Sequence, residues 1–533
     1  MHTLTNNFGK LAMFILRRDR IRISVWIFAI TLITVVIPPA FDEMYHTQQE
    51  RQVMAFTMEN PAMVAMIGPV YGVDNYTVGA MNGNMMTLFM AITAGIMNIF
   101  LVVRHTRKDE ESGRIEVIRS LPAGRLSNLL ATLLVSLFVN VVLAFVNGIG
   151  LSLLRIDGME LGSCMLFGAI LGVTGFLFAA VTALFTQLSP SARGAQGYTF
   201  AFLGLAYLVR ASGDVGNETL SLISPLGLIL RTKVFVEDIW YPVFIVLLIS
   251  AVFILVALYL NAKRDLGEGL IPARPGRKTA SVFLSNSLGL SMKLLASTLI
   301  GWILCVFIIG AAYGSVLGDL EGFLENNEIL QQVLAGNNDY TMTEQFITML
   351  MSIMTMMGTI PVLMVVLKIR AEEKKNRLEH LAARAVSKNE ILSGYFGISF
   401  VLSIVVQLAS VFGLWFAGTV VMDTPISFLN LMKSALAYLP AMWMMVGVAV
   451  LLNGIFPKGT GFVWIYLGYS FLAVYLGKIL QFPEWMSRIT PFGNIPQIPV
   501  EEFTMVPLVV LTIVALLLTL AGFAGFRQRD LEG

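Results

Sequence analysis

The chain has 533 residues, of which 56% are hydrophobic and only 13% are charged, and its formal net charge is +2. A soluble protein of this length could not keep so much apolar surface from water, so the composition excludes a soluble enzyme or binding module and predicts a chain that lives in a bilayer. A net charge this small provides no field that would attract nucleic acid, so no nucleic-acid partner is expected.

Apolar runs along the chain have the length that a membrane-spanning helix needs, which is about 20 residues. The sequence therefore predicts an all-α, polytopic membrane protein with about 12 transmembrane helices and short amphipathic helices on the membrane surface. The twelve runs are roughly 23–41, 84–104, 129–154, 161–187, 196–212, 240–260, 294–314, 344–368, 391–418, 428–454, 460–480 and 505–526.

Basic residues gather before the first run and after the second, sixth and twelfth runs, as at Arg17-Arg18, Arg107-Lys108, Lys263-Arg264 and Arg527. Positive charge marks the cytoplasmic side of a membrane protein. With twelve spans, all of these clusters fall on one side. The pattern predicts a multi-pass protein of the cell membrane with both termini in the cytoplasm.

Residues 4–22 have the pattern of an amphipathic helix. Phe8, Leu11, Ala12 and Ile15 recur at helical spacing, with basic residues off that face. Such a helix suits the inner surface of the membrane. A charged leader that only sets the orientation of the first span is an equally good interpretation. The segment 42–83 is expected to form further short helices or an ordered loop.

Four polar residues in or near the spans are candidates for a translocation path. Thr93 and Asn98 lie in the second run, where hydrogen bonding between helices is the common role of such residues and lining a path is the other. Arg210 and Lys478 are single bases at the outer ends of the fifth and eleventh runs. Their side chains either reach the headgroups or contact a ligand.

The densest charged segment, 107–125, occurs twice. Arg107, Glu110, Arg114 and Glu116 match Arg370, Glu373, Arg377 and Glu379, each 263 positions later. Glu110 precedes Arg114 by four residues, which is the favourable order for an ion pair on a helix. A surface pair adds little stability, so docking of a partner explains the duplication better than stability does. The alternative is an ancestral loop that only caps two helices. The candidate coupling residues are Glu110, Arg114, Glu116, Glu373, Arg377 and Glu379.

Other motifs repeat at nearly the same distance. Pro190 matches Pro457 at 267 positions, and Arg264-Asp265-Leu266 matches Arg529-Asp530-Leu531 at 265. These offsets predict a duplication of the whole chain into two parallel six-span bundles, 1–266 and 281–533, joined by a cytoplasmic linker at 267–280. Transporters with such repeats place the substrate path where the repeats meet.

The sequence contains no phosphate-binding loop, no catalytic Ser/His/Asp arrangement and no zinc-ligand spacing. Cys164 and Cys305 both lie inside spans, so a disulfide framework is not expected. His105 and His380 are expected to be solvated helix residues. Few carboxylates lie in the spans, although an ion-coupled pump needs them there. We therefore expect no catalytic residue, metal or cofactor in this chain, and energy supplied by another one.

Five motifs occur in order along the chain: Arg17-Arg18-Asp19-Arg20-Ile21-Arg22, the segment 107–125, Tyr207-Leu208-Val209-Arg210-Ala211, Ser224-Pro225-Leu226-Gly227 and Arg529-Asp530-Leu531. With these motifs the chain resembles the type-2 ABC exporter permeases, in particular the double-length group described as putative exporters of polyketide antibiotics. The resemblance covers nearly the whole chain. In the second copy Arg384-Ala385-Val386 replaces Leu121-Pro122-Ala123, which suits the family better.

The resemblance implies that two separately encoded ABC ATPase subunits dock beneath the two charged segments and bind the ATP and magnesium. It implies that ATP-driven closure of these subunits rocks the two halves and moves a small hydrophobic or amphipathic compound, such as an antibiotic, out of the cell. Two other hypotheses stay open from the residues alone. One is a secondary transporter driven by an ion gradient, and the other is a membrane sensor or assembly factor.

Overall fold

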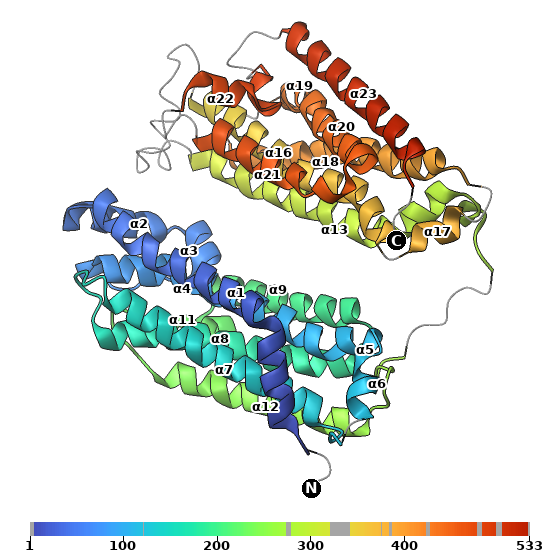
Figure 1. The fold of residues 1–533 in the computed structure, drawn as a ribbon. Helices are drawn as coiled ribbons and strands as arrows, with labels where there is room; N and C mark the ends of the chain where they lie inside the picture. The colour runs from blue at the N-terminus through green and yellow to red at the C-terminus, as the bar shows by residue number, and fades with distance from the viewer. Residues whose placement is uncertain are drawn as a thin grey trace. The chain divides into compact units, whose positions relative to one another are not determined.

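A computed structural model describes residues 5–120, 122–272, 279–319, 342–374, 376–382, 386–422, 427–476, 482–496 and 504–530. Within these ranges the chain forms helices and no strand, so the predicted all-α fold is confirmed (Figure 1). The chain divides into two compact units, Met1–Gly276 and Arg277–Gly533.

Ten helices in the described part of the chain are long and apolar enough to cross a membrane. The chain is therefore a polytopic membrane protein, with five of these helices in each unit. They are Phe8–Met44, Val78–Glu111, Ser127–Ser152, Leu161–Leu188 and Tyr241–Lys263 in the first unit, and Ser287–Ser315, Thr343–Glu373, Lys388–Val421, Phe428–Ile455 and Met505–Gln528 in the second.

The two other predicted spans are helical but are not among these ten. The run 196–212 lies in α9 (Ala192–Gly216), a 25-residue helix whose sequence includes Arg210 and Asp214. The run 460–480 begins with α21 (Phe462–Phe471) and a π-helical turn, and its last residues lie outside the described ranges.

The first unit begins with α1, an unbroken helix of 37 residues from Phe8 to Met44. The amphipathic segment predicted at 4–22 is therefore continuous with the first span from Phe8 onward. Ala12 and Ile15 are buried, whereas Met13 and Phe14 are exposed. The remaining elements are α2 (Gln48–Met58), α3 (Pro61–Ile67), η1 (Val73–Asn75), α4 (Val78–Val103), η2 (Arg104–Lys108), α5 (Asp109–Glu111), α6 (Arg114–Arg119), α7 (Ser127–Ser152), α8 (Leu161–Leu188), α9, α10 (Glu218–Ile223), α11 (Pro225–Leu230) and α12 (Tyr241–Lys263).

Helix α8 forms the centre of the first unit, with most of its length buried against α4, α7 and α12. Small residues allow this close packing. A Cβ on Gly168 would lie 2.1 Å from the Ala144 carbonyl oxygen of α7. Helices in membranes commonly associate through such small residues, because lipid provides no hydrophobic drive between them.

The second unit is built around α16 and α18, and its core includes Met354, Val366, Leu414 and Met445. Its elements are η3 (Val282–Ser285), α13 (Ser287–Val316), η4 (Leu317–Asp319), α16 (Met342–Glu373), α17 (Arg377–Ala382), α18 (Lys388–Val421), α19 (Phe428–Ala437), α20 (Leu439–Ile455), η5 (Pro457–Gly459), α21, η6 (Leu472–Leu476), α22 (Glu484–Arg488), η7 (Phe492–Asn494) and α23 (Met505–Gln528).

Candidate coupling site

The charged segment after α4 is not one continuous helix. It passes through a π-helical turn at η2 and the short α5, and then turns at Gly113, whose φ of 72° is left-handed. Glycine accepts this conformation without strain, which ends the helix there. Glu110 and Arg114 therefore lie on opposite sides of a turn. The ion pair expected from their spacing does not form, and Arg114 Nη1 contacts Asp109 Oδ1 at 3.2 Å instead.

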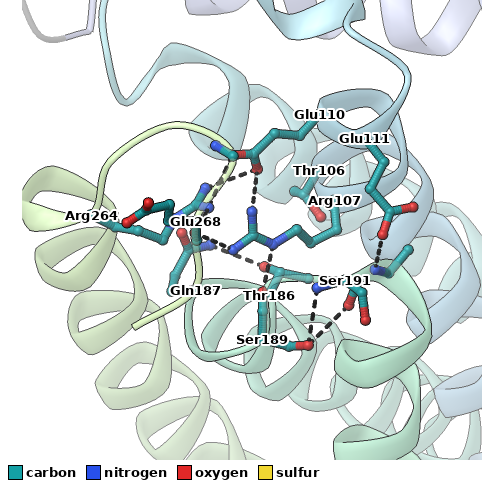
Figure 2. A network of polar contacts seen from close by, with 12 residues as sticks. Thr106, Arg107, Glu110, Glu111, Thr186, Gln187, Ser189, Ser191, Arg264 and Glu268 are labelled. Carbon is teal, nitrogen blue, oxygen red and sulfur yellow. Dashed lines mark hydrogen bonds and ion pairs between the residues drawn. The ribbon is translucent and has the colours of Figure 1, made fainter. Parts of the chain in front are cut away.

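Glu110 lies at the centre of a group of ion pairs inside the first unit (Figure 2). Arg264 donates to it through both terminal nitrogens, each at 3.0 Å. Arg107 Nη1 lies 3.0 Å from Oε2, and the Gly267 amide donates to Oε1 at 2.6 Å. The Glu110 side chain is only 7% exposed. We call Arg107, Glu110 and Arg264 the first clamp, because they join the end of α4 to the end of α12.

Arg107 connects the first clamp to two further segments. Its Nε donates to the Ser189 carbonyl at 2.7 Å, in the turn between α8 and α9, and its Nη2 donates to the Glu268 carbonyl (Figure 2). Glu111 Oε1 accepts the Ala192 amide at 2.6 Å, at the first residue of α9. The ends of four long helices are thus fastened together at one end of the unit.

The second unit repeats this arrangement. Glu373 receives Arg529 Nη1 at 2.6 Å and Nη2 at 2.9 Å, and Arg370 Nη1 lies 3.0 Å away. We call Arg370, Glu373 and Arg529 the second clamp. Its residues follow those of the first by 263 and 265 positions. The repeat therefore preserves a set of contacts, and not only a run of charges.

A fourth residue of each set is also duplicated. Arg125 donates to the carbonyl of Arg264 at 2.6 Å, and Lys388, 263 positions later, donates to the carbonyl of Arg529 at 2.7 Å. Arg125 lies just before the third long helix of the first unit, and Lys388 is the first residue of the third long helix of the second unit. Each donates to a carbonyl that lies just past the end of the last long helix of its unit. Such carbonyls have no partner within their own helix.

The six predicted coupling residues fall into two groups. Glu110 and Glu373 face inward and belong to the clamps. The other four are exposed on the short helices α6 and α17, with side-chain exposures of 63% for Arg114 and 60% for Arg377. Glu116 and Glu379 are exposed as well. Ile115 and Leu378 are buried, so α6 and α17 each keep one apolar residue against the unit.

The predicted path residues in the second span have contacts of a structural kind. Asn98 is fully buried and exchanges amide hydrogen bonds with Asn140 at 2.8 and 3.0 Å, and Ser136 donates to it at 2.6 Å. This pair joins α4 to α7. The Thr93 hydroxyl donates to the Phe89 carbonyl of its own helix.

Arg210 is fully buried and reaches the short helix α3. It donates to the carbonyls of Val64, Ala65 and Met66 and pairs with Asp214 at 3.3 Å. A cation at the C-terminal end of a helix satisfies its last carbonyls. Arg210 thus holds α3 against α9. Lys478 lies outside the described residues.

The sequence interpretation missed two features of the site. Arg264 and Arg529 were not assigned to it, although the repeated Arg-Asp-Leu motif was the signal that could have found them. His105, which was expected to be solvated, is fully buried. Its Nε2 lies 2.8 Å from Asp19 Oδ2, because α1 packs its charged turn against the end of α4.

The buried histidine belongs to a larger network that only the first unit has in the described part of the chain. Arg104 Nε also lies 2.9 Å from Asp19 Oδ2, and Arg18 pairs with Asp109. At the matching positions of the second unit, Lys368 pairs with Glu372 at 3.3 Å. No group of three or more His, Cys, Asp or Glu side chains within the described ranges could hold a metal ion.

Comparison with known proteins identifies the family. A family model described as the multidrug efflux system permease Rv1217c, C-terminal domain, matches residues 9–260 and 284–527. The multidrug efflux system permease protein Rv1217c of Mycobacterium tuberculosis (strain ATCC 25618 / H37Rv) is 34% identical over 535 residues, which cover 99% of this chain and 96% of that protein. The chain therefore belongs to the family of the C-terminal domain of the multidrug efflux system permease Rv1217c.

Proposed function

We propose that this chain is the membrane-spanning permease subunit of an ATP-driven exporter of the ABC-2 type. Its cargo is a small hydrophobic or amphipathic compound, with antibiotics as candidates, and transport runs out of the cell. The name of the mycobacterial relative supports export of drugs. The large apolar surface of the chain suits a transporter that handles compounds soluble in lipid.

The observation that supports this proposal most strongly is the duplicated clamp beside an exposed short helix. Helices of six residues, such as α6 and α17, do not keep their position by themselves. A turn at Gly113 connects the first clamp to α6, and α17 begins four residues after the clamp glutamate Glu373. If docking of a partner moves α6, the ends of α4 and α12 should move with it, because Glu110 and Arg264 join them.

The partners that fit are two copies of a separate ABC ATPase, since the site occurs twice in one chain. ATP and magnesium bind to these partners, and this chain supplies no nucleotide site and no cofactor of its own. Its sequence contains no phosphate-binding loop. The basic clusters favour the cytoplasmic side for both clamps and both termini, in a cell membrane.

One observation favours the ion-gradient alternative. His105 and Asp19 form a buried pair in the first unit, and a proton-coupled transporter requires acidic and basic side chains inside its membrane domain. The pair lies at the clamp end of α4, beside Arg104 and Arg18. Arg104 and Arg18 already balance the charges of the Asp19 and Asp109 carboxylates. This balance fits a structural role of the pair better than proton transport.

Affinity purification of the full chain from its native membrane in mild detergent, followed by mass spectrometry, tests the proposal. We expect an ABC ATPase to be recovered at about two copies per chain. The proposal is wrong if the chain is recovered alone and if collapse of the proton gradient, with ATP maintained, stops drug export from intact cells.

A further inference from the structure

A polar recess lies beside the first clamp, between the clamp ends of α7, α8 and α12 and the short helix α6. The centres of water-sized molecules can occupy only about 30 Å3 of it, and the empty space between its walls, including open solvent at its mouth, is about 520 Å3. Apolar side chains such as Leu11 and Ile118 form part of its wall. Its main polar residues are Thr106, Arg125, Asn128, Gln187, Asn261 and Arg264.

Three polar atoms of residues that line this recess have no hydrogen-bond partner within the part of the chain that the structure describes. They are Asn261 Oδ1, Arg264 Nε and Arg125 Nε. Asn261 is 9% exposed, and its amide nitrogen already donates to Gln187 Oε1 at 2.8 Å. Buried polar groups without partners are rare in folded proteins, since each costs free energy. Arg529 Nε of the second clamp has no partner either, so the atom that sets the first unit apart is Asn261 Oδ1, whose matching residue Phe526 has no polar side chain.

The charges around the recess favour an anion. Two guanidinium groups, those of Arg125 and Arg264, line the recess with one carboxylate, that of Glu110, which Arg264 and Arg107 already pair. Three further acids lie nearby but do not line the recess. Glu111 accepts the Ala192 amide, Glu268 is exposed, and the Asp265 side chain is almost fully exposed and lies 3.9 Å from Arg125. A solvated pair at this distance compensates little of the charge.

The second unit provides an internal comparison, because it repeats the clamp without the polar lining. Phe526 stands where the first unit has Asn261, and it is only 1% exposed, so it fills the corresponding space. The clamp thus forms equally well among apolar side chains, and the polar lining of the first unit is not needed for it. The replacements are Thr106 by Ile369, Asn128 by Ile391, Gln187 by Gly454 and Asn261 by Phe526, at the offsets of the repeat.

The surroundings of the recess have the features of a membrane interface. Lys263 Nζ lies 4.4 Å from the ring centroid of Tyr259, and the Tyr259 side chain is exposed near the end of α12. Tyrosine with lysine is typical of the headgroup level of a membrane. On α1, exposed Met13 and Phe14 lie beside exposed Arg17. Exposed apolar and basic residues together suit an anionic lipid surface.

We propose that this recess binds the headgroup of an anionic phospholipid from the inner leaflet. The phosphate oxygens accept hydrogen bonds from Arg125 and Arg264, and a hydroxyl group of the headgroup donates to Asn261 Oδ1. Phosphatidylglycerol has both groups. The acyl chains remain outside the recess, against the exposed apolar side of the unit. This proposal rests on the cytoplasmic placement of the clamps proposed above, and it does not depend on how transport is powered.

Native mass spectrometry of the full chain, extracted from nanodiscs of phosphatidylglycerol and phosphatidylethanolamine in equal amounts, tests the proposal. We expect one phosphatidylglycerol per chain to be retained during stepwise delipidation. Asn261→Phe introduces the side chain of the second unit and should lower retention about tenfold, because it fills the recess and removes the acceptor. Asn261→Ala removes only the acceptor and should lower retention in the same direction.

Lys388→Gln is the matched control. It removes the corresponding base of the second unit, where apolar residues stand at the positions that match Thr106, Asn128 and Asn261, and should leave retention unchanged. Equal retention of the two lipids by the unmodified chain, or unchanged retention in both Asn261 variants, overturns the proposal. Displacement of the lipid by inorganic phosphate at equal concentration also overturns it, since a soluble phosphate would then be the ligand.

Discussion

Glu110 and Glu373 are interior residues, although their sequence neighbours are strongly polar. Each carboxylate accepts two hydrogen bonds from an arginine that directly follows the last long helix of its unit. Each also contacts a second arginine. Bidentate arginine–carboxylate pairs of this kind are stronger than ordinary hydrogen bonds and fix the geometry of both partners. At the scale of single residues, the site therefore depends on which charges lie inside and which lie outside.

Substitution of a clamp glutamate should destabilise its unit far more than substitution of an exposed one. Glu110→Ala leaves the buried guanidinium groups of Arg107 and Arg264 without their carboxylate, and breaking such a pair costs about 3–5 kcal/mol. Glu116→Ala should stay within about 0.5 kcal/mol of the unmodified chain, because Glu116 is exposed. Equilibrium unfolding of the purified chains in detergent measures both. Equal effects of the two substitutions would contradict the burial of Glu110.

Asn98 provides a second prediction at this scale. If its amide joins α4 to α7, the effects of Asn98→Ala and Asn140→Ala on stability should overlap, with a coupling of about 0.6–1.7 kcal/mol in a double-mutant cycle. Both variants should keep the cargo selectivity of the unmodified chain in an export assay. Independent effects on stability, or a changed cargo range in Asn98→Ala alone, would favour the path interpretation.

The short helices α6 and α17 are the elements on which the docking proposal depends. Their exposed faces include Arg114, Glu116, Arg377 and Glu379, whereas Ile115 and Leu378 hold the opposite faces. Exposed charges of this kind affect association more than folding, because partners are attracted and oriented by complementary charge.

Charge reversal on both short helices should therefore weaken binding of the ATPase without unfolding the chain. Arg114→Glu with Arg377→Glu should lower ATPase recovery in a pull-down about tenfold or more, while the unfolding curve remains close to that of the unmodified chain. Arg193→Glu serves as a control, since Arg193 is an exposed base of α9 that belongs to neither helix. Full recovery of the ATPase with the double variant would exclude α6 and α17 as docking elements.

The sequence predicted the long helices well and their connections poorly. Apolar runs of about 20 residues identified all ten helices that are long and apolar enough to span a membrane in the described ranges, because the bilayer imposes both length and composition. The clamp could not be found in the same way. Glu110 and Arg264 are 154 residues apart, and their contact depends on which helix ends lie side by side. His105 has a polar local sequence, and only the packing of α1 against α4 buries it.

At the scale of the whole molecule, the two units share the clamps and differ around them. The first unit has the network of His105 and Asp19 and the polar recess near Asn261, whereas the second has Lys368 with Glu372 and the buried Phe526. A duplicated chain can change one copy while the other preserves the original contacts. The shared clamp therefore marks what both units must do, and the differences mark functions of one unit alone.

Substitution of the last arginine in each clamp tests whether both units must transmit force. Arg264→Gln and Arg529→Gln each leave their glutamate with fewer donors, and each should lower unit stability by about 3 kcal/mol. Because the clamps belong to separate compact units, these effects should add in the double variant.

Export should not follow this additivity. If transport needs both units to move together, either single substitution should stop most drug export, and the double should lower it little further. Export from intact cells, normalised to the amount of chain in the membrane, measures this. Arg125→Lys, which imitates Lys388 and preserves the charge, is the control and should export normally. Half of the original export in each single variant would show instead that the two units work independently.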